Sequence, residues 1–335
     1  MGKVKIGIIG AGRIGEIHAK NIVTMIKNAE LLAVADSFED RAKEFARKYE
    51  VPQCFNDYTV MLENTEIDAV LICSNTSGHK EAIIKAAEQG KAIFCEKPIA
   101  LSMEETDEAL AVVEKNKVLM QVAFMRRFDP AIFAAKQEIQ KGTIGEPLVM
   151  RSISRDPEGP SLDYVGLSGG FFVDSSIHDI DLSRWFMDSE IEKVYAEGKT
   201  LIYPQYKKHG DADVAFTTLS FTNGKIGSIE NSRRSGYGYD TRLEISGTDG
   251  TLQIGYLRNT NFKILNKAGS IHDIVPSWQE RFTDAFVNEM NHFVECVIEG
   301  KTPLITGYDA KKALSVALAA TKSYKTGTAV AVSDY

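Results

Sequence analysis

Residues 5–15, Lys-Ile-Gly-Ile-Ile-Gly-Ala-Gly-Arg-Ile-Gly, join a short apolar strand directly to a glycine-rich turn. In such a turn Gly10 permits a sharp change of direction, and Gly12 lets the backbone approach a diphosphate closely. Gly15 allows the following helix to pack against the sheet. The N-terminus of that helix presents unpaired N–H groups to an anion. The pattern therefore predicts the first β-α-β unit of a Rossmann fold that binds a dinucleotide.

A second apolar run, residues 31–35, ends in Asp36, about 20 residues beyond the fingerprint. A carboxylate at this strand end can accept hydrogen bonds from both ribose hydroxyls, whereas a 2′-phosphate there would meet a like charge. Ser37, and not an arginine, comes next. These residues favour NAD over NADP. An alternative role for Asp36, compatible with the first, is to cap a helix predicted over residues 38–49.

Length, charge and cysteine spacing exclude several classes of protein. At 335 residues the chain is long enough for two domains. A net charge of −7 without a basic stretch argues against a nucleic-acid partner. No segment approaches the roughly 20 apolar residues of a membrane span or resembles a signal peptide, so we expect a cytoplasmic protein. The four cysteines lack CxxC spacing, which favours reduced thiols over disulfides or a zinc site.

The first third of the chain alternates short apolar strands with amphipathic helical stretches, which predicts a doubly wound parallel sheet. Ligands of such sheets bind beyond the carboxyl ends of the strands. The expected strands cover residues 5–9, 31–35, 69–74, 92–95 and 118–124. The candidate NAD contacts at their carboxyl ends are Gly10, Ala11, Gly12, Arg13, Ile14, Gly15, Asp36, Ser37, Ser74, Asn75, Thr76, His79, Glu96, Lys97 and Pro98.

After about residue 125 the pattern becomes helix followed by many strands. We predict a Rossmann domain over residues 1–125 and an α+β domain over residues 126–335, whose large, mainly antiparallel open sheet leaves one face free to associate. Asn223-Gly224 and Asp249-Gly250 are typical of hairpin turns. The expected strands are 147–155, 191–203, 214–221, 225–232, 241–246 and 251–255, and the expected helices are 130–141, 174–187, 281–299 and 309–325.

Glu96-Lys97-Pro98 directly follows an apolar strand. Proline fixes its own φ and biases the preceding residue toward an extended backbone, so Lys97 has little backbone freedom at the strand end. A lysine there can polarise a substrate oxygen or lower the pKa of a nearby base. The alternative is an ordinary surface lysine.

Residues 169–181, Gly-Gly-Phe-Phe-Val-Asp-Ser-Ser-Ile-His-Asp-Ile-Asp, form the second candidate cluster. In a helix that begins at Asp174, the side chains of Asp174, His178 and Asp181 share one face, within roughly 60° of one another. A histidine between carboxylates is a credible general base, because imidazole ordinarily titrates near neutrality. A metal site is an alternative, although hydride transfer needs no metal and we expect none. Another alternative is a helix cap at Asp174 beside a structural histidine.

With these motifs in view, the chain resembles the glucose-fructose oxidoreductase and inositol dehydrogenase family over essentially its whole length. Within that family it looks most like the myo-inositol 2-dehydrogenases. The motifs that carry this further resemblance are Phe124-Met125-Arg126-Arg127-Phe128-Asp129, Ser154-Arg155-Asp156-Pro157 with Ser168-Gly169-Gly170, and Asn231-Ser232-Arg233-Arg234 with Tyr237-Gly238-Tyr239-Asp240.

The resemblance implies Lys97, Asp174 and His178 as catalytic residues, NAD as cofactor and a homotetramer. It implies oxidation of a cyclic polyol, with myo-inositol giving 2-keto-myo-inositol. The segment 173–176, Val-Asp-Ser-Ser, departs from the larger side chains expected in close relatives, and this leaves the preferred isomer open. A sugar dehydrogenase or reductase of the same family and a non-enzymatic NAD-binding regulator are the alternatives. The implied substrate contacts are Lys97, Met125, Arg126, Arg127, Asp156, Asp174, Ser175, His178, Tyr237 and Tyr239.

Overall fold

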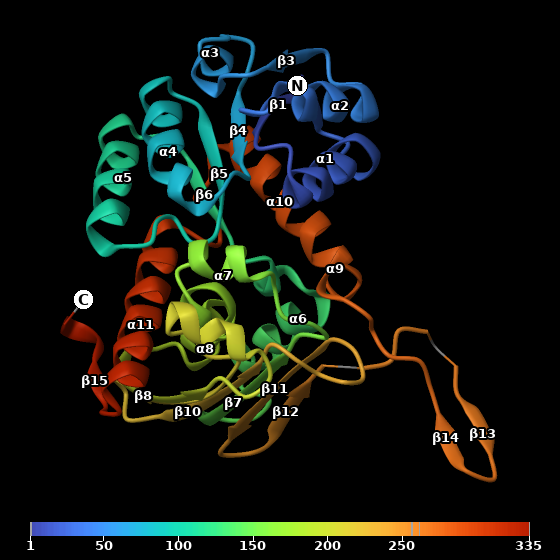
Figure 1. The fold of residues 1–335 in the computed structure, drawn as a ribbon, viewed down its shortest axis with the longest axis vertical. Coiled ribbons are helices and arrows are strands. Elements are labelled where there is room, and N and C mark those ends of the chain that lie inside the picture. Colours follow the sequence, from blue (N-terminus) through green and yellow to red (C-terminus); the bar gives the residue numbers. More distant parts are fainter. Residues whose placement is uncertain (1, 256, 261, 335) are drawn as a thin grey trace. The chain divides into compact units, whose positions relative to one another are not determined.

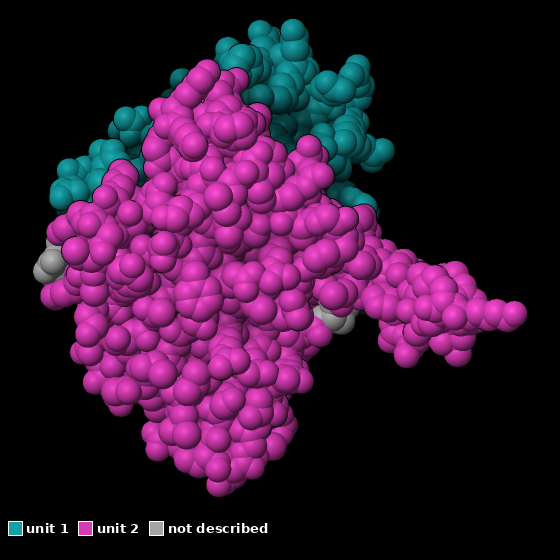
Figure 2. All heavy atoms as spheres, turned by 60° about the horizontal axis from the view of Figure 1, so that its bottom comes forward, with its two compact units in different colours: residues 1–128, 284–311 teal, residues 129–283, 312–335 magenta. Residues whose placement is uncertain are grey.

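The computed structural model describes residues 2–255, 257–260 and 262–334, which form two compact units (Figures 1 and 2). The first unit contains residues 1–128 and 284–311, and the second contains residues 129–283 and 312–335. The sequence places a domain boundary after residue 125. The first segment of this unit instead ends at Phe128. Residues 284–311, more than 150 positions further along the chain, also belong to the first unit.

The first unit is built on a six-stranded sheet in the order β3-β2-β1-β4-β5-β6, in which every neighbouring pair is parallel. This is the strand order of a dinucleotide-binding Rossmann fold, and it confirms the predicted fold class of this half. The strands are β1 (Val4–Ile9), β2 (Ala29–Ala35), β3 (Gln53–Phe55), β4 (Ala69–Ile72), β5 (Ala92–Glu96) and β6 (Met120–Ala123).

Helices lie against both faces of this sheet, so its central strands are apolar on both sides. Ile6, Ile8 and Phe94 are completely buried. Met290 and Phe293 of helix α10 belong to the same hydrophobic core, which explains why the late segment returns to this unit. The helices and helical turns are α1 (Arg13–Met25), α2 (Glu39–Tyr49), α3 (Tyr58–Leu62), η1 (Thr76–Gly78), α4 (His79–Glu88), α5 (Met103–Asn116), η2 (Met125–Phe128) and nearly all of α10 (Thr283–Glu299).

The second unit is built on a seven-stranded sheet in the order β12-β11-β7-β10-β9-β8-β15. Its neighbours are antiparallel except for the parallel pair β7 and β10, so the prediction of a mainly antiparallel sheet is confirmed. The turns at Asn223-Gly224 and Asp249-Gly250 each join two antiparallel neighbours, as expected. The strands are β7 (Pro147–Arg155), β8 (Ile191–Lys199), β9 (Val214–Phe221), β10 (Ile226–Ser232), β11 (Asp240–Gly247), β12 (Thr251–Ile254) and β15 (Val330–Ala331).

Helices of the second unit pack on one face of this sheet, with α8 against β7 and β10 (Figure 1). The other face exposes apolar side chains at Leu148, Tyr195, Phe216 and Ile226. The helices and helical turns are α6 (Pro130–Gln140), α7 (Leu162–Leu167), η3 (Phe172–Ser176), α8 (Ile177–Met187), η4 (Pro204–His209), α9 (Trp278–Arg281), α11 (Gly307–Thr326), which begins in the first unit, and η5 (Val332–Asp334).

Two local predictions need correction. The expected α-helix from Asp174 begins instead with a π-helical turn, η3, and becomes α-helical only at Ile177. The strand expected to reach Tyr203 ends at Lys199, because Pro204 starts the short helix η4. The small exposed hairpin of β13 (Ile264–Asn266) and β14 (Gly269–Ile271), visible in Figure 1, was not predicted.

Candidate active site

The glycine fingerprint lies between β1 and α1, and a side chain at Gly10 or Gly15 would collide with the backbone. Gly10 has φ of 102°, and a Cβ there would lie 2.8 Å from the backbone that follows β4. A Cβ on Gly15 would lie 2.2 Å from the Gly10 carbonyl oxygen. A Cβ on Gly12 would meet no atom within 4 Å, and Gly12 caps α1 without a side-chain hydrogen bond. The helix N-terminus is therefore approachable by an anion, as the fingerprint predicts.

Asp36 is the buried acidic residue at the end of β2, and it ties the fingerprint to helix α2. Its Oδ2 accepts from Ala11 N–H at 2.9 Å, and its Oδ1 accepts from Phe38 N–H at 2.9 Å. The guanidinium of Arg41 donates to both oxygens, at 2.9 and 2.6 Å. Burial raises the pKa of Asp36, but hydrogen bonds from Arg41, Phe38 and Ala11 outweigh it, so the pKa lies below its usual value.

A carboxylate offers about four acceptor positions, and these donors fill them. A ribose diol would therefore bind Asp36 in exchange for Arg41, whose side chain is about half exposed. The sequence offered Asp36 as a ribose ligand or a helix cap. In the structure, the Asp36 carboxylate accepts a hydrogen bond from the backbone N–H of Phe38, the N-cap residue of α2. The Phe38 side chain itself makes no capping hydrogen bond.

The remaining candidate cofactor contacts follow β4 and β5, which are neighbours in the sheet. After β4, Ser74 and Thr76 are partly buried and Asn75 is exposed. After β5, Lys97 is partly buried and is joined to buried Pro98 by a cis peptide bond. The two segments thus leave the same edge of the sheet, where ligands of Rossmann folds bind.

Behind Glu96 lies a group of buried polar side chains that the sequence did not flag. Glu289 of α10 is completely buried, and neither carboxyl oxygen has a hydrogen-bond partner among the described residues. Burial and the charge of Glu96 raise the pKa of Glu289 well above its usual value. Burial likewise raises the pKa of the Cys73 and Cys95 thiols. The two thiols and the Glu289 carboxyl therefore favour their neutral forms.

Glu289 predicts a pH dependence of stability. In the unfolded chain this carboxyl ionises near its usual pKa of 4.5, whereas burial holds its pKa in the folded chain well above that value. Unfolding then releases a proton, so the wild type loses stability as the pH rises above about 4.5. We expect Glu289→Gln to melt close to the wild type near pH 4 and at a higher temperature near pH 8, with the difference growing between these values.

Thermal melts of both proteins across this pH range test the prediction. Glu295→Gln is the matched control, because Glu295 is exposed on the same helix. It should show no growing difference. A melting difference for Glu289→Gln that is constant with pH, or shrinks as the pH rises, would contradict the assignment.

In the second unit, the backbone before η3 is set by two glycines. Gly169 and Gly170 have φ of 81° and 88°, in the left-handed region. The following N–H, of Phe171, donates to Asp211 Oδ1 at 2.8 Å. The π-helical turn then carries Asp174, and His178 follows one residue into α8. Such π turns are frequent at functional sites, and here one sets the direction of the predicted catalytic aspartate.

Tyr164 and Arg233 both hydrogen-bond to the Asp174 carboxylate. Tyr164 of α7 donates its hydroxyl to Oδ1 at 2.9 Å, and Arg233 donates to Oδ2 at 3.1 Å. The Arg233 side chain is 2% exposed and lies over the Phe171 ring. Burial lowers the pKa of Arg233, but the charges of Asp174 and Asp211 outweigh it, so its pKa is raised. Sequence reasoning quoted Arg233 only as part of a motif and missed this contact, because 59 residues separate the pair.

Asp179, next to His178, has a structural role. Its Oδ1 accepts from Ser152 and Ser154 of β7 at 2.6 and 2.8 Å, and its Oδ2 accepts from Asn231 of β10 at 2.9 Å. The residue is completely buried. These bonds fix α8 to the sheet and thereby fix the helix that carries His178.

Besides Lys97, the candidate substrate contacts of the first unit lie in η2, where Met125, Arg126 and Arg127 are buried. The Arg127 guanidinium donates to Asp309 Oδ1 at 3.0 Å, within the same unit. This ion pair gives Arg127 a structural role.

The candidate substrate contacts of the second unit differ in exposure. Asp156 and Ser175 are partly buried. Tyr239 is 3% exposed, whereas Tyr237 is 41% exposed. The Tyr237 hydroxyl donates to Asp240 at 2.7 Å and accepts from Arg155 at 2.8 Å. The exposed Tyr237 therefore hydrogen-bonds to both an acidic and a basic side chain.

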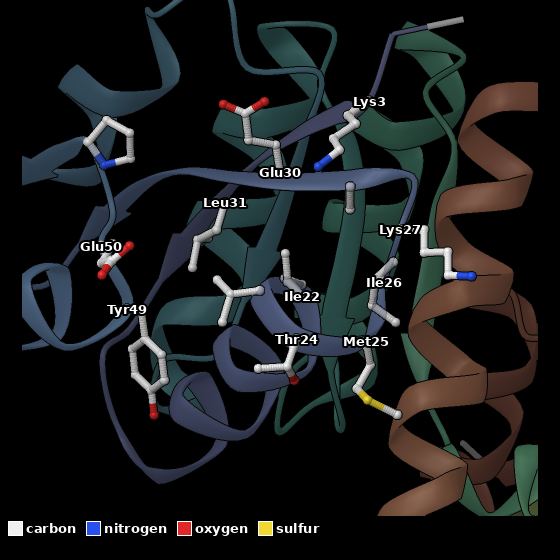
Figure 3. Close-up of a pocket in the computed structure, with 13 residues that line it drawn as sticks. Lys3, Ile22, Thr24, Met25, Ile26, Lys27, Glu30, Leu31, Tyr49 and Glu50 are labelled. Atoms are coloured by element: carbon white, nitrogen blue, oxygen red, sulfur yellow. The ribbon is translucent and has the colours of Figure 1, made fainter.

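The first unit also has a surface pocket (Figure 3). It is lined by the end of α1 and the start of β2, at the edge of the sheet opposite the fingerprint, and none of the predicted site residues lines it. Among residues 2–255, 257–260 and 262–334, no three His, Cys, Asp or Glu side chains gather in a metal-binding group. No helix in these ranges is long and apolar enough to cross a membrane.

Two family models match the chain in succession. Residues 4–124 match the NAD-binding Rossmann fold of the GFO/IDH/MocA oxidoreductases, and residues 136–332 match the C-terminal alpha/beta domain of the same family. The chain belongs to the GFO/IDH/MocA oxidoreductase family. The recognition made from the motifs is confirmed, and so is NAD as the cofactor.

The relatives of this GFO/IDH/MocA protein match it from end to end. A scyllo-inositol 2-dehydrogenase (NAD(+)) of Bacillus subtilis is 44% identical over 98% of this chain and 96% of its own. A myo-inositol 2-dehydrogenase of Thermotoga maritima is 40% identical over 96% of each chain. The crystal structure of scyllo-inositol dehydrogenase from Lactobacillus casei with bound NAD(H) and scyllo-inositol has a TM-score of 0.94 at 33% identity, and the match covers 99% of each chain. The chain is therefore an NAD-dependent oxidoreductase of CH–OH groups.

Proposed function

We propose that the protein oxidises one secondary hydroxyl of an inositol to a ketone. Its full-length similarity to NAD-dependent inositol dehydrogenases carries this proposal. The residues of the first unit suit NAD: the diphosphate has the open N-terminus of α1, and the adenosine ribose has Asp36. When bound, NAD supplies the hydride acceptor.

Lys97, Asp174 and His178 are the catalytic residues of the proposal. His178 removes the hydroxyl proton as general base, because imidazole titrates near neutral pH. Asp174, held by Tyr164 and Arg233, orients His178. Lys97 stabilises the negative charge that develops on the substrate oxygen. Lys97 and the Asp174-His178 pair belong to different units, and the resemblance to the family supports their action on one hydroxyl.

A polyol needs many hydrogen-bonding groups in fixed positions, since each unpaired polar group would oppose binding. Arg126, Asp156 and Ser175 supply donors and acceptors on buried or partly buried segments. We propose these residues as contacts to the substrate hydroxyls, with Tyr237 or Tyr239 completing the set.

The sequence motifs favour myo-inositol as the substrate. The 44% identity to the scyllo-inositol 2-dehydrogenase of Bacillus subtilis favours scyllo-inositol instead. The two isomers differ at the single carbon that oxidation makes trigonal. They give the same ketone, so product analysis does not distinguish them and initial rates do. A pyranose dehydrogenase is the second candidate, because it would use the same catalytic residues.

Initial rates of NAD and NADP reduction test the proposal, measured against myo-inositol, scyllo-inositol, chiro-inositol and glucose. Saturable reduction of NAD with an inositol is the expected result. Activity with glucose alone would replace the inositol assignment by a sugar dehydrogenase. Tight NAD binding without turnover on any of the four substrates would contradict the proposed function.

We further propose a cytoplasmic homotetramer that associates through the open face of the seven-stranded sheet. Support comes from four apolar side chains on that face, each more than a third exposed: Leu148, Tyr195, Phe216 and Ile226. Burying such side chains between copies is favourable. Light scattering should give the mass of four chains, and Phe216→Glu should lower it.

A further inference from the structure

Two buried histidines of the first unit contact the residues on either side of Lys97. His18 of α1 lies with Nε2 3.1 Å from Glu96 Oε1. His79, the first residue of α4, lies with Nδ1 2.8 Å from the carbonyl oxygen of Pro98. Both imidazole rings are essentially inaccessible, at 0% and 1% exposure. Lys97 itself is partly buried.

The His18 ring is fixed on more than one side. It makes edge contacts with the Phe94 and Phe286 rings, with centroids 5.1 and 5.7 Å apart. The Glu96 carboxylate is partly buried, and a hydrogen bond to it from an imidazole N–H restricts both side chains. His18 therefore fixes the Glu96 side chain immediately before Lys97.

The His79 ring spans two strand-end segments. Its Nε2 lies 3.0 Å from the Ser74 carbonyl oxygen, after β4, while its Nδ1 faces Pro98, after β5. Burial lowers the pKa of His79, although the Pro98 and Ser74 carbonyls oppose this. A neutral imidazole carries one N–H. We place that proton on Nδ1, because the contact with Pro98 is the shorter. Sequence analysis offered His79 as a cofactor contact, but both its nitrogens face main-chain oxygens.

We propose that His18 and His79 are positioning residues for Lys97. His18 holds the Glu96 side chain on one side, and His79 holds the Pro98 carbonyl on the other. A lysine side chain is long and flexible, so its ammonium group can be placed accurately only if the backbone that carries it is fixed. A misplacement of 1 Å can cost about 100-fold in rate. The inference rests on the proposed catalytic role of Lys97.

His18 contacts Glu96 through Nε2, whereas His79 contacts Pro98 through Nδ1. The same two substitutions should therefore have opposite effects at the two positions. The amide nitrogen of asparagine occupies nearly the place of Nδ1, and that of glutamine nearly the place of Nε2. We expect His79→Asn and His18→Gln to retain kcat within about threefold, because each keeps its donor. We expect His79→Gln and His18→Asn to lose about 10- to 100-fold in kcat.

Three further readouts separate positioning from a general loss of structure. The affinity for NAD, measured by fluorescence titration, and the melting temperature should be similar within each pair of variants. The primary isotope effect on kcat, measured with inositol deuterated at the reacting carbon, should rise in the two impaired variants, since misplacement of Lys97 slows the chemical step.

Equal activity of the asparagine and glutamine variants at each position would overturn the proposal. A loss of kcat that follows NAD affinity or melting temperature would also overturn it. Lys97→Met, measured in parallel, tests the premise: wild-type turnover in that variant contradicts the proposed role of Lys97 and with it the inference. If Lys97→Met has a low turnover but the asparagine and glutamine variants at His18 and at His79 do not differ as expected, the inference is refuted and the proposed role of Lys97 stands.

Discussion

Replacing Lys97 with methionine should lower kcat about 100- to 1,000-fold, which is the range for removing one donor that stabilises a developing oxyanion. Methionine keeps much of the length and apolar character of the lysine side chain and removes its charge. Lys97 sits at the carboxyl end of β5, between Glu96 and a cis proline. Its proposed contact strengthens as charge develops on the substrate oxygen, so the loss should appear in kcat and kcat/KM alike.

NAD affinity should fall far less than kcat, because the fingerprint and Asp36 lie on other segments of the first unit. Initial rates with the best substrate of the panel, together with fluorescence titration of NAD, measure both quantities. Lys115→Met is the matched control, since Lys115 is exposed on α5 and should keep full activity. Near wild-type turnover of Lys97→Met, or a loss explained by weaker NAD binding, would refute the catalytic assignment.

The cofactor half of the molecule was predictable because its requirements are local. A strand, three glycines and an acidic strand end occupy about 30 consecutive residues, and each has a steric or electrostatic reason that sequence alone exposes. The structure gives the reasons individually. Gly10 and Gly15 lie where any Cβ would collide with backbone, while Gly12 faces open space. The parallel order of the sheet follows from the alternation of strands and helices.

Contacts between residues far apart in the chain were not predicted from the sequence. The return of α10 to the first unit depends on Met290 and Phe293 fitting a core formed by residues more than 160 positions earlier. An amphipathic helix shows which face is buried but not against what. Arg233 and Asp174 pair across 59 residues for the same reason. Arg41, five residues after Asp36 at the start of α2, is different: its spacing could have suggested an ion pair.

The π-helical turn at η3 was not predicted from the sequence for a different reason. It arises from a shift in backbone hydrogen bonding over five residues and has no composition of its own. The prediction of a plain α-helix was right for α8 and wrong for the turn that carries Asp174. The identities of the candidate catalytic residues were thus available from sequence, whereas the local backbone that directs one of them was not.

His178→Asn should produce the other large effect, a fall in kcat of about 100- to 10,000-fold, the contribution typical of a positioned general base. Asparagine preserves polarity and approximate size but cannot take a proton near neutral pH. The fall should be accompanied by a changed pH profile. In the wild type, kcat/KM for oxidation should decline toward acid pH as the imidazole becomes protonated, and the variant should lack this limb.

Rates between about pH 5 and pH 9 measure the profile. His209→Asn is the control, because His209 is exposed on η4 of the same unit and should leave rate and profile unchanged. Because His178 follows a carboxylate held by Tyr164 and Arg233, its replacement should disturb chemistry more than folding. A melting temperature near that of the wild type with a strongly reduced kcat would support this, whereas an intact acid limb in His178→Asn would assign the proton transfer to another group.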